Sequence, residues 1–123
     1  MYTVTIRDHI MIAHSFNDKF FGPAMRLHGA TYIVDVSFSS DSLNEHNVLI
    51  DIGHAQRLLQ EVLAPLDYRN LDEFPEFKDA LTTTEFMAKY IHDQIRQKVT
   101  GTFSGKIGVT LGESHVARAS YED

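Results

Sequence analysis

The chain has 123 residues, of which 43% are hydrophobic and none is cysteine. This length predicts one domain over residues 1–123 with a core of modest size, and the missing cysteines exclude disulfides, thiolate metal sites and a cysteine nucleophile. A net charge of -6 without a basic run argues against nucleic acid or an anionic membrane as partner. The first residues lack the basic flank and apolar block of a signal peptide, so the expected location is the cytoplasm.

The first part of the chain predicts two strands. Val4, Ile6, Ile10 and Ile12 share one parity within residues 2–14, which indicates a strand over this range. Residues 15–29 have the Asn, Asp, Gly and Pro content of a loop. The β-branched and aromatic run over 30–39 predicts the second strand.

A helix is expected next. Residues 40–47 form a polar connection and residues 48–50 a short extended run. Apolar side chains at helical spacing then predict a helix over about 53–64, capped by Asp51 and stopped by Pro65.

The second helix follows a long connection over residues 65–82, and a connection of this length in a small chain is often functional. Either Thr83 or Thr84 caps the helix, which is expected to run to about Val99.

Two closing strands, over 105–112 and 115–121, complete the order strand, strand, helix, helix, strand, strand. This ββααββ pattern predicts an α+β fold in which an antiparallel sheet carries two helices on one face. The other face of the sheet would stay open, which points to self-association.

Two histidines flank the first loop. His14 ends the first predicted strand and His28 precedes the second, so pairing of these strands would bring the two imidazoles together. A catalytic zinc usually needs three protein ligands, and the alternative is a pair of hydrogen-bonding histidines. His9, His46, His54 and His92 are assigned no role, and His92 is expected on a solvated helix face.

Three polar segments could carry chemistry or only structure. In PLDYRNLDEFPEF, Asp67 could tune a neighbouring titratable group, or the segment is a polar connection. In TTTEF, the hydroxyls could hold a polar ring, although Thr capping with an early Glu is ordinary helix chemistry. Glu113 could accept two parallel N–H bonds from a guanidine-like ring edge, or it is an exposed turn residue.

Taken in this order, several segments resemble the 6-pyruvoyl-tetrahydropterin synthase / 6-carboxytetrahydropterin synthase family over nearly the whole chain. They are AHSF, AMRLHGATY, NVLIDI, LDYRNL, the helix start TTE and the late turn Glu113–Ser114. The resemblance implies the tunnelling fold (T-fold), in which trimers close their sheets into a barrel and two trimers usually stack into a hexamer. It also implies pterin pockets at the interfaces between subunits.

The family's mechanism implies a role for each matched position. Three histidines bind zinc, a cysteine acts as base and an Asp–His pair relays protons. His14 and His28 match two zinc ligands, whereas Ala30 stands at the third and Ala24 at the cysteine.

The relay and ring-holding positions differ in how well they match. Asp67 matches the relay aspartate, but Tyr68 replaces its histidine. The set that holds the pterin ring in the family is matched throughout, by Thr83, Thr84, Glu85 and Glu113.

Three hypotheses follow from this pattern. The first is a carbon–oxygen lyase of the family with altered chemistry on a dihydropterin such as dihydroneopterin triphosphate, with zinc on two histidines completed by water or a side chain such as His115. The second is a pterin- or purine-binding protein that has lost catalysis. The third is a scaffold that keeps only the barrel. In each case the resemblance implies a homotrimer or homohexamer.

Overall fold

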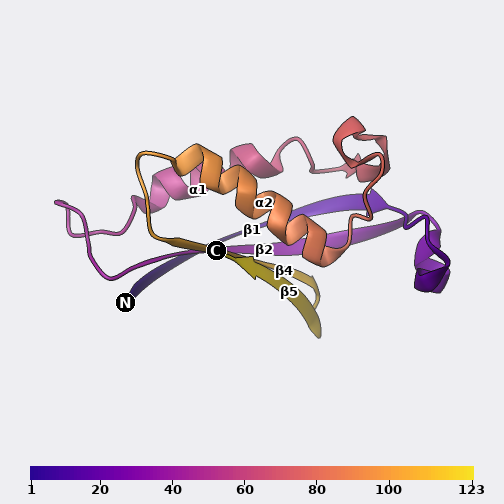
Figure 1. The fold of residues 1–123 in the computed structure, drawn as a ribbon, viewed down its shortest axis with the longest axis horizontal. Coiled ribbons are helices and arrows are strands. Elements are labelled where there is room, and N and C mark those ends of the chain that lie inside the picture. Colours follow the sequence, from indigo (N-terminus) through magenta and orange to yellow (C-terminus); the bar gives the residue numbers. More distant parts are fainter.

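A five-stranded sheet with the strand order β3-β1-β2-β4-β5 is covered on one face by two helices (Figure 1). The computed structural model describes all residues 1–123. The elements are β1 (Tyr2–His14), β2 (His28–Ser40), α1 (Ile52–Leu63), β3 (Arg69–Asn70), α2 (Thr84–Val99), β4 (Lys106–Ser114) and β5 (Ala117–Glu122). The predicted α+β class and order of the main elements are confirmed, with the short β3 as an addition between the helices.

The long β1–β2 hairpin sets the geometry of the molecule. Its antiparallel register runs from Tyr2 opposite Ser40 to His14 opposite His28. Alternate side chains point to one face, and those beneath the helices are the buried apolar ones. The strands supply to the core Ile6, Ile10, Ile12, Tyr32, Val34, Val36, Phe38, Ile107, Val109 and Leu111.

Both helices begin where the sequence places a capping side chain. The Asp51 carboxylate accepts a hydrogen bond from the His54 N–H at 2.8 Å, and the Thr83 hydroxyl accepts one from Phe86 N–H at 3.1 Å. Each cap satisfies an amide that the helix itself leaves free. Neither helix has the length and apolar composition needed to span a bilayer.

The segment before α1 differs from its prediction. Residues 48–50 form bends and no strand. The Asn44 side chain accepts hydrogen bonds from the His46 and Val48 amides at 2.9 and 3.3 Å, which closes a turn. Leu49 and Ile50 are consequently buried in the core as a loop.

The loop before β2 is shorter than predicted. His28 and Gly29 pair with His14 and Ala13, so β2 begins two residues early. Short 3-10 turns occupy Lys19–Met25 within the remaining loop. His28 is therefore the first residue of the strand, directly opposite His14.

The open face of the sheet is mostly polar, although Met11 and Ile33 are exposed on it. Thr3 and Thr5 hydrogen-bond across the hairpin to Ser39 and Ser37, each at 2.9 Å. Beside them, Arg7 and Asp35 form a two-bonded ion pair at 2.7 and 3.0 Å. Polar cross-strand pairs of this kind are stable in water, so the bare face does not by itself require a partner.

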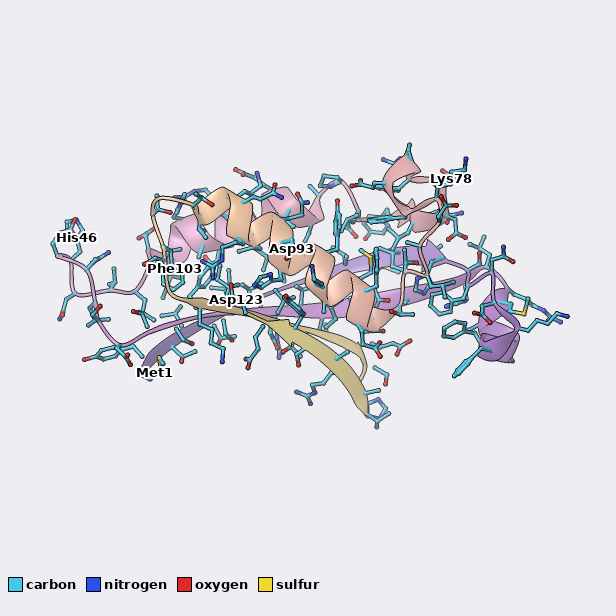
Figure 2. The ribbon with its side chains drawn as sticks, in the orientation of Figure 1. Met1, His46, Lys78, Asp93, Phe103 and Asp123 are labelled. Atoms are coloured by element: carbon cyan, nitrogen blue, oxygen red, sulfur yellow. The ribbon has the colours of Figure 1, made fainter.

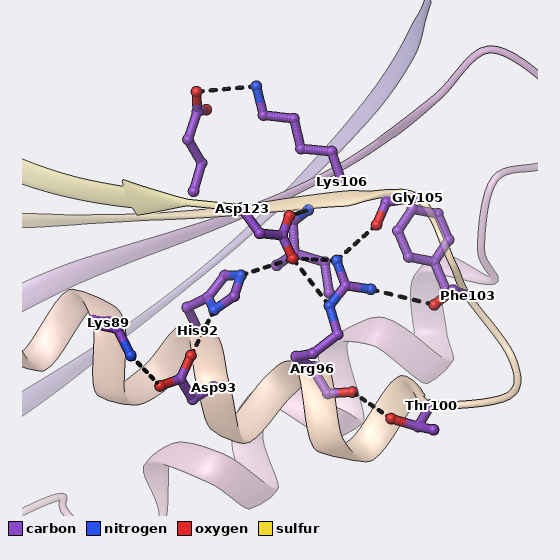
Figure 3. A network of polar contacts seen from close by, with 11 residues as sticks. Lys89, His92, Asp93, Arg96, Thr100, Phe103, Gly105, Lys106 and Asp123 are labelled. Atoms are coloured by element: carbon purple, nitrogen blue, oxygen red, sulfur yellow. Dashed lines mark hydrogen bonds and ion pairs between the residues drawn. The ribbon is translucent and has the colours of Figure 1, made fainter.

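His92 is buried, which contradicts its expected place on a solvated helix face. Only 4% of the residue is exposed. Its Nδ1 lies 2.9 Å from the Asp93 carboxylate and its Nε2 3.1 Å from that of Asp123 (Figure 3). Tyr121 on β5 packs edge-on against the ring. The end of the chain returns over α2 and covers His92.

Asp123 links β5 and β4 to α2 through hydrogen bonds and an ion pair. Its carboxylate accepts bonds from the Ile107 amide at 2.9 Å and from the Arg96 guanidinium, which also donates to the Gly105 carbonyl at 2.7 Å (Figure 3). Burial acts to raise the pKa of Asp123, but the Ile107 N–H and Arg96 outweigh it and hold that pKa below its usual range.

Asp123→Asn is expected to lower the free energy of unfolding by about 1–2 kcal/mol at pH 7, since the amide loses charge-assisted bonds that solvent partly screens. Urea unfolding measures this loss. Because the folded-state pKa is depressed, the stabilisation is complete above the unfolded value of about 3.9 and disappears as pH falls through the lower folded value. Glu122→Gln, which breaks only an exposed pair with Lys106, is the control, and equal losses in both variants would contradict the prediction.

Candidate functional site

The connection before α1 and the connection before α2 extend from opposite ends of the sheet. His46 marks the tip of the segment before α1, and Lys78 the segment before α2 (Figure 2). The end of the sheet that carries Lys78 also holds the last residue of β1, the first of β2 and the start of α2 (Figure 1). The sequence motifs that suggest chemistry gather largely at this end.

His14 and His28 lie face to edge, with ring centroids 4.6 Å apart. The His14 ring is buried, its Nδ1 is 3.1 Å from the Thr82 hydroxyl, and its Nε2 has no hydrogen-bond partner. In His28, Nδ1 is 2.8 Å from the Arg26 carbonyl oxygen. A carbonyl only accepts, so this nitrogen donates and the Nε2 of neutral His28 keeps its lone pair.

The electrostatics favour a neutral imidazole at His14. Burial lowers the pKa of His14 and the neighbouring His28 lowers it further, while Thr82 and Asp72 act weakly in the opposite direction. At neutral pH the ring therefore carries a lone pair, which is the form that binds metals. The pair supplies two nitrogens suited to a metal ion.

The set of three ligands typical of catalytic zinc is incomplete. No group of three or more His, Asp or Glu side chains is arranged to hold a metal ion. Ala30 lies two residues beyond His28 on the same face of β2, where a third ligand would be expected. His115, the candidate replacement, is exposed in the turn after β4 and lines a hollow with Arg7 on the open face. The residues present therefore do not fit the three-histidine site that the resemblance implies.

A second group of polar residues surrounds Tyr32. Its side chain is fully buried, and its hydroxyl has no aligned hydrogen-bond partner. Burial raises the pKa of Tyr32 to about 12; the Thr84 hydroxyl acts to lower it, and the charges of Glu113 and Glu85 add to the rise. Three members of the expected ring-holding set thus act on the pKa of one buried phenol. In the fourth, Thr83, the hydroxyl accepts the hydrogen bond from the Phe86 amide that caps α2.

Glu113 is exposed at a bulge of β4. The pairing with β5 slips by one residue between Gly112 and Ser114, which leaves Glu113 as the extra residue. Bulges re-aim side chains and are frequent beside functional sites. The carboxylate is therefore available to a ligand and has no hydrogen-bond partner within this chain.

Asp67 and Tyr68 lie at a different edge. The Asp67 carboxylate accepts a bond from the Met11 amide at 2.9 Å, and Tyr68 is 78% exposed with φ of 59°. They precede β3, whereas Glu113 belongs to β4, so β1 and β2 separate the two positions in the sheet. One copy of the chain does not bring the relay pair to the ring-holding set.

Sequence reasoning missed Tyr32 and one contact of Thr82. The segment TTTEF offers the Thr82 hydroxyl to a polar ring, but this hydroxyl lies 3.1 Å from Nδ1 of His14 and joins the start of α2 to β1. The available signal for Tyr32 was parity, because it shares the face of His28 in β2. The contact of Thr82 with His14 had no comparable signal, since the two residues are 68 positions apart.

Comparison with known proteins decides the family. The family model described as 6-pyruvoyl tetrahydropterin synthase matches residues 3–123. The chain belongs to the 6-pyruvoyl tetrahydropterin synthase family. The resemblance drawn from the sequence motifs is thereby confirmed.

Relatives within the 6-pyruvoyl tetrahydropterin synthase family carry two names. The chain is 32% identical over 81 residues to the 6-pyruvoyl tetrahydrobiopterin synthase of Dictyostelium discoideum, covering 64% of this chain and 60% of that protein. It is 24% identical over 131 residues to the 6-carboxy-5,6,7,8-tetrahydropterin synthase of Aquifex aeolicus, covering 86% of this chain and 80% of that protein. The match thus spans about three-fifths of the Dictyostelium protein.

Solved structures of the family share the fold. The Caenorhabditis elegans 6-pyruvoyl tetrahydropterin synthase superimposes with a TM-score of 0.86 at 21% identity, covering 99% of this chain and 95% of that one. A Plasmodium vivax 6-pyruvoyltetrahydropterin synthase gives a TM-score of 0.81 at 18% identity, with coverage of 99% and 97%. The expected T-fold is confirmed.

Proposed function

We propose that this protein binds a dihydropterin, such as dihydroneopterin triphosphate, and acts on it as a carbon–oxygen lyase with altered chemistry. The feature that carries the proposal is an unequal match: Thr84, Glu85 and Glu113 are present and all act on the pKa of Tyr32, while Ala24 and Ala30 stand where the resemblance places the cysteine and the third histidine.

Ring recognition follows from the chemistry of Glu113. A carboxylate accepts two parallel N–H bonds from a guanidine-like edge, which a pterin presents through its ring nitrogen and amino group. Thr84 and Glu85 add a hydroxyl and a second negative charge beside the same position. A site built on polar pairing discriminates strongly, because a ligand lacking the N–H groups leaves the carboxylate unpaired.

Catalysis would depend on Asp67 and Tyr68, the residues at the family's relay positions. They occupy the β3 side of the sheet and Glu113 the β4–β5 side, so a complete site needs residues from two copies. We therefore include a homotrimer or homohexamer in the proposal. The bound zinc of the family is not carried over, since His14 and His28 lack a third ligand.

A second candidate is a pterin- or purine-binding protein without catalysis. The observation in its favour is the alanine at position 24, which can neither accept nor donate a proton. The two candidates share the ring site and differ only in turnover.

One experiment tests both. Protein purified without a histidine tag is titrated with fluorescent neopterin, and then incubated with dihydroneopterin triphosphate while product and metal content are measured. Saturable binding with turnover supports the lyase, and saturable binding without product supports the second candidate. Failure to bind either a pterin or a purine would overturn both.

A further inference from the structure

We propose that the hydroxyl of Tyr32 is a ligand-binding group, which donates a hydrogen bond to an acceptor atom of the bound ring while Glu113 accepts the ring's N–H groups. This inference rests on the proposed function and names a further residue of the same site. It concerns the bound state, because in the free chain the hydroxyl has no aligned hydrogen-bond partner.

Packing in the core does not explain why residue 32 carries a hydroxyl. The residue has 0% exposure and lies in the core among apolar strand residues, yet its oxygen lacks an aligned hydrogen-bond partner. Buried polar groups in native proteins are nearly always paired, and an unpaired one is destabilising. Phenylalanine would fill the same space without that cost.

The strand register directs Tyr32 toward Glu113. The β2–β4 ladder ends with Ile33 opposite Gly112, so continuing it by one residue sets Tyr32 opposite Glu113. Directly opposed residues have Cβ atoms about 5 Å apart. The bulge at Glu113 lies on the other side of β4, in its pairing with β5, and a bulge of this kind re-aims the side chain of the extra residue.

The start of α2 also affects the phenol. Thr84 is buried in the first turn of the helix and acts to lower the pKa of Tyr32, although the two hydroxyls form no aligned hydrogen bond, and the exposed Glu85 follows it in the chain. The raised pKa of Tyr32, about 12, keeps the phenol protonated at neutral pH, so it can act as a donor. Both surrounding carboxylates remain available as acceptors.

The combination specifies a class of ligand. Glu113 requires neighbouring N–H donors, and the Tyr32 hydroxyl requires a lone pair close to them. A 2-amino-4-oxo pyrimidine ring presents both on one edge, whereas a 2,4-diamino ring replaces the oxo acceptor with a donor. Tyr32 is therefore a specificity-determining residue that favours the oxo form.

The test is Tyr32→Phe, with Tyr2→Phe as the matched control, since Tyr2 lies opposite Ser40 at the end of the β1–β2 hairpin away from Tyr32. Urea unfolding of the free protein gives the midpoint, and fluorescence titration gives Kd for neopterin and for a 2,4-diaminopteridine. Tyr32→Phe should unfold at the wild-type midpoint or higher, weaken neopterin binding roughly 3- to 10-fold, and reduce the preference for neopterin over the diamino ring. Tyr2→Phe should leave both Kd values unchanged.

The outcomes separate the two proposals. Unchanged Kd values in Tyr32→Phe, with tight binding by the wild type, would overturn the role of the hydroxyl and leave the proposed function standing. A lower midpoint in Tyr32→Phe would show that the hydroxyl already has a partner in the free chain, which also overturns the inference. No binding of neopterin by the wild type would overturn the proposed function and this inference together.

Discussion

Ala30→His is expected to raise zinc affinity about 100-fold. The new imidazole would join His14 and His28 on the helix-covered face, because residues 28 and 30 share that face of β2. Structural zinc sites with four ligands are worth about 10–16 kcal/mol, which is about 3 kcal/mol or 100-fold for each ligand. Competition with a calibrated zinc chelator measures the change.

Ala13→His is the matched control for this substitution. Ala13 adjoins His14 in sequence but has the opposite parity in β1, so its side chain points to the other face. We expect little change in zinc affinity from it. An Ala30→His variant that binds zinc no better than wild type would show that the segment RLHGATY is misaligned with the family motif.

The cysteine position can be restored in the same background. Ala24 lies within the 3-10 turns, and its carbonyl accepts a bond from the Phe16 amide at 3.2 Å. Phe16 packs against both histidine rings, so residue 24 lies close to the imidazole pair. Adding Ala24→Cys to Ala30→His should create lyase activity on dihydroneopterin triphosphate if the losses at these two positions account for the altered chemistry.

Local physics made most of the fold predictable. Strand parity identified the buried faces of β1, β2 and β4, and the side chains of Asp51 and Thr83 fixed both helix starts. These signals act within a few residues, and the sequence contains them directly. The loop before α1 was missed because one side chain, Asn44, bends an apolar run that reads as extended.

The site was less predictable because its contacts join distant segments. His28 belongs to β2 only through its pairing with His14, and its neighbour Gly29 has the composition of a loop. His92 is buried by Tyr121 and Asp123 from the far end of the chain. The hairpin order predicted the meeting of His14 and His28, but no period in the sequence reports the burial of His92, which depends on how the sheet and helices pack.

The largest functional effect is expected from Glu113→Gln. The amide can accept only one of the two N–H bonds and turns a donor toward the ring edge, so a charge-assisted pair is lost. Truncating one partner of such a pair costs about 2–5 kcal/mol, which is at least about 30-fold in Kd for neopterin. Stability should remain within about 0.5 kcal/mol of wild type, because Glu113 is an exposed residue without a partner in the chain.

Two further variants locate the effect at this carboxylate. Glu122→Gln removes an equal charge from β5, where Glu122 lies opposite Gly108, and should leave Kd unchanged, which excludes a general electrostatic effect. Glu85→Gln removes the second charge beside Tyr32 and should weaken binding less than Glu113→Gln, because Glu85 lies on the helix turn and not opposite Tyr32 along the strand register. Wild-type affinity in Glu113→Gln would contradict ring recognition by this residue, and the preserved side chains around Tyr32 would then need a different explanation.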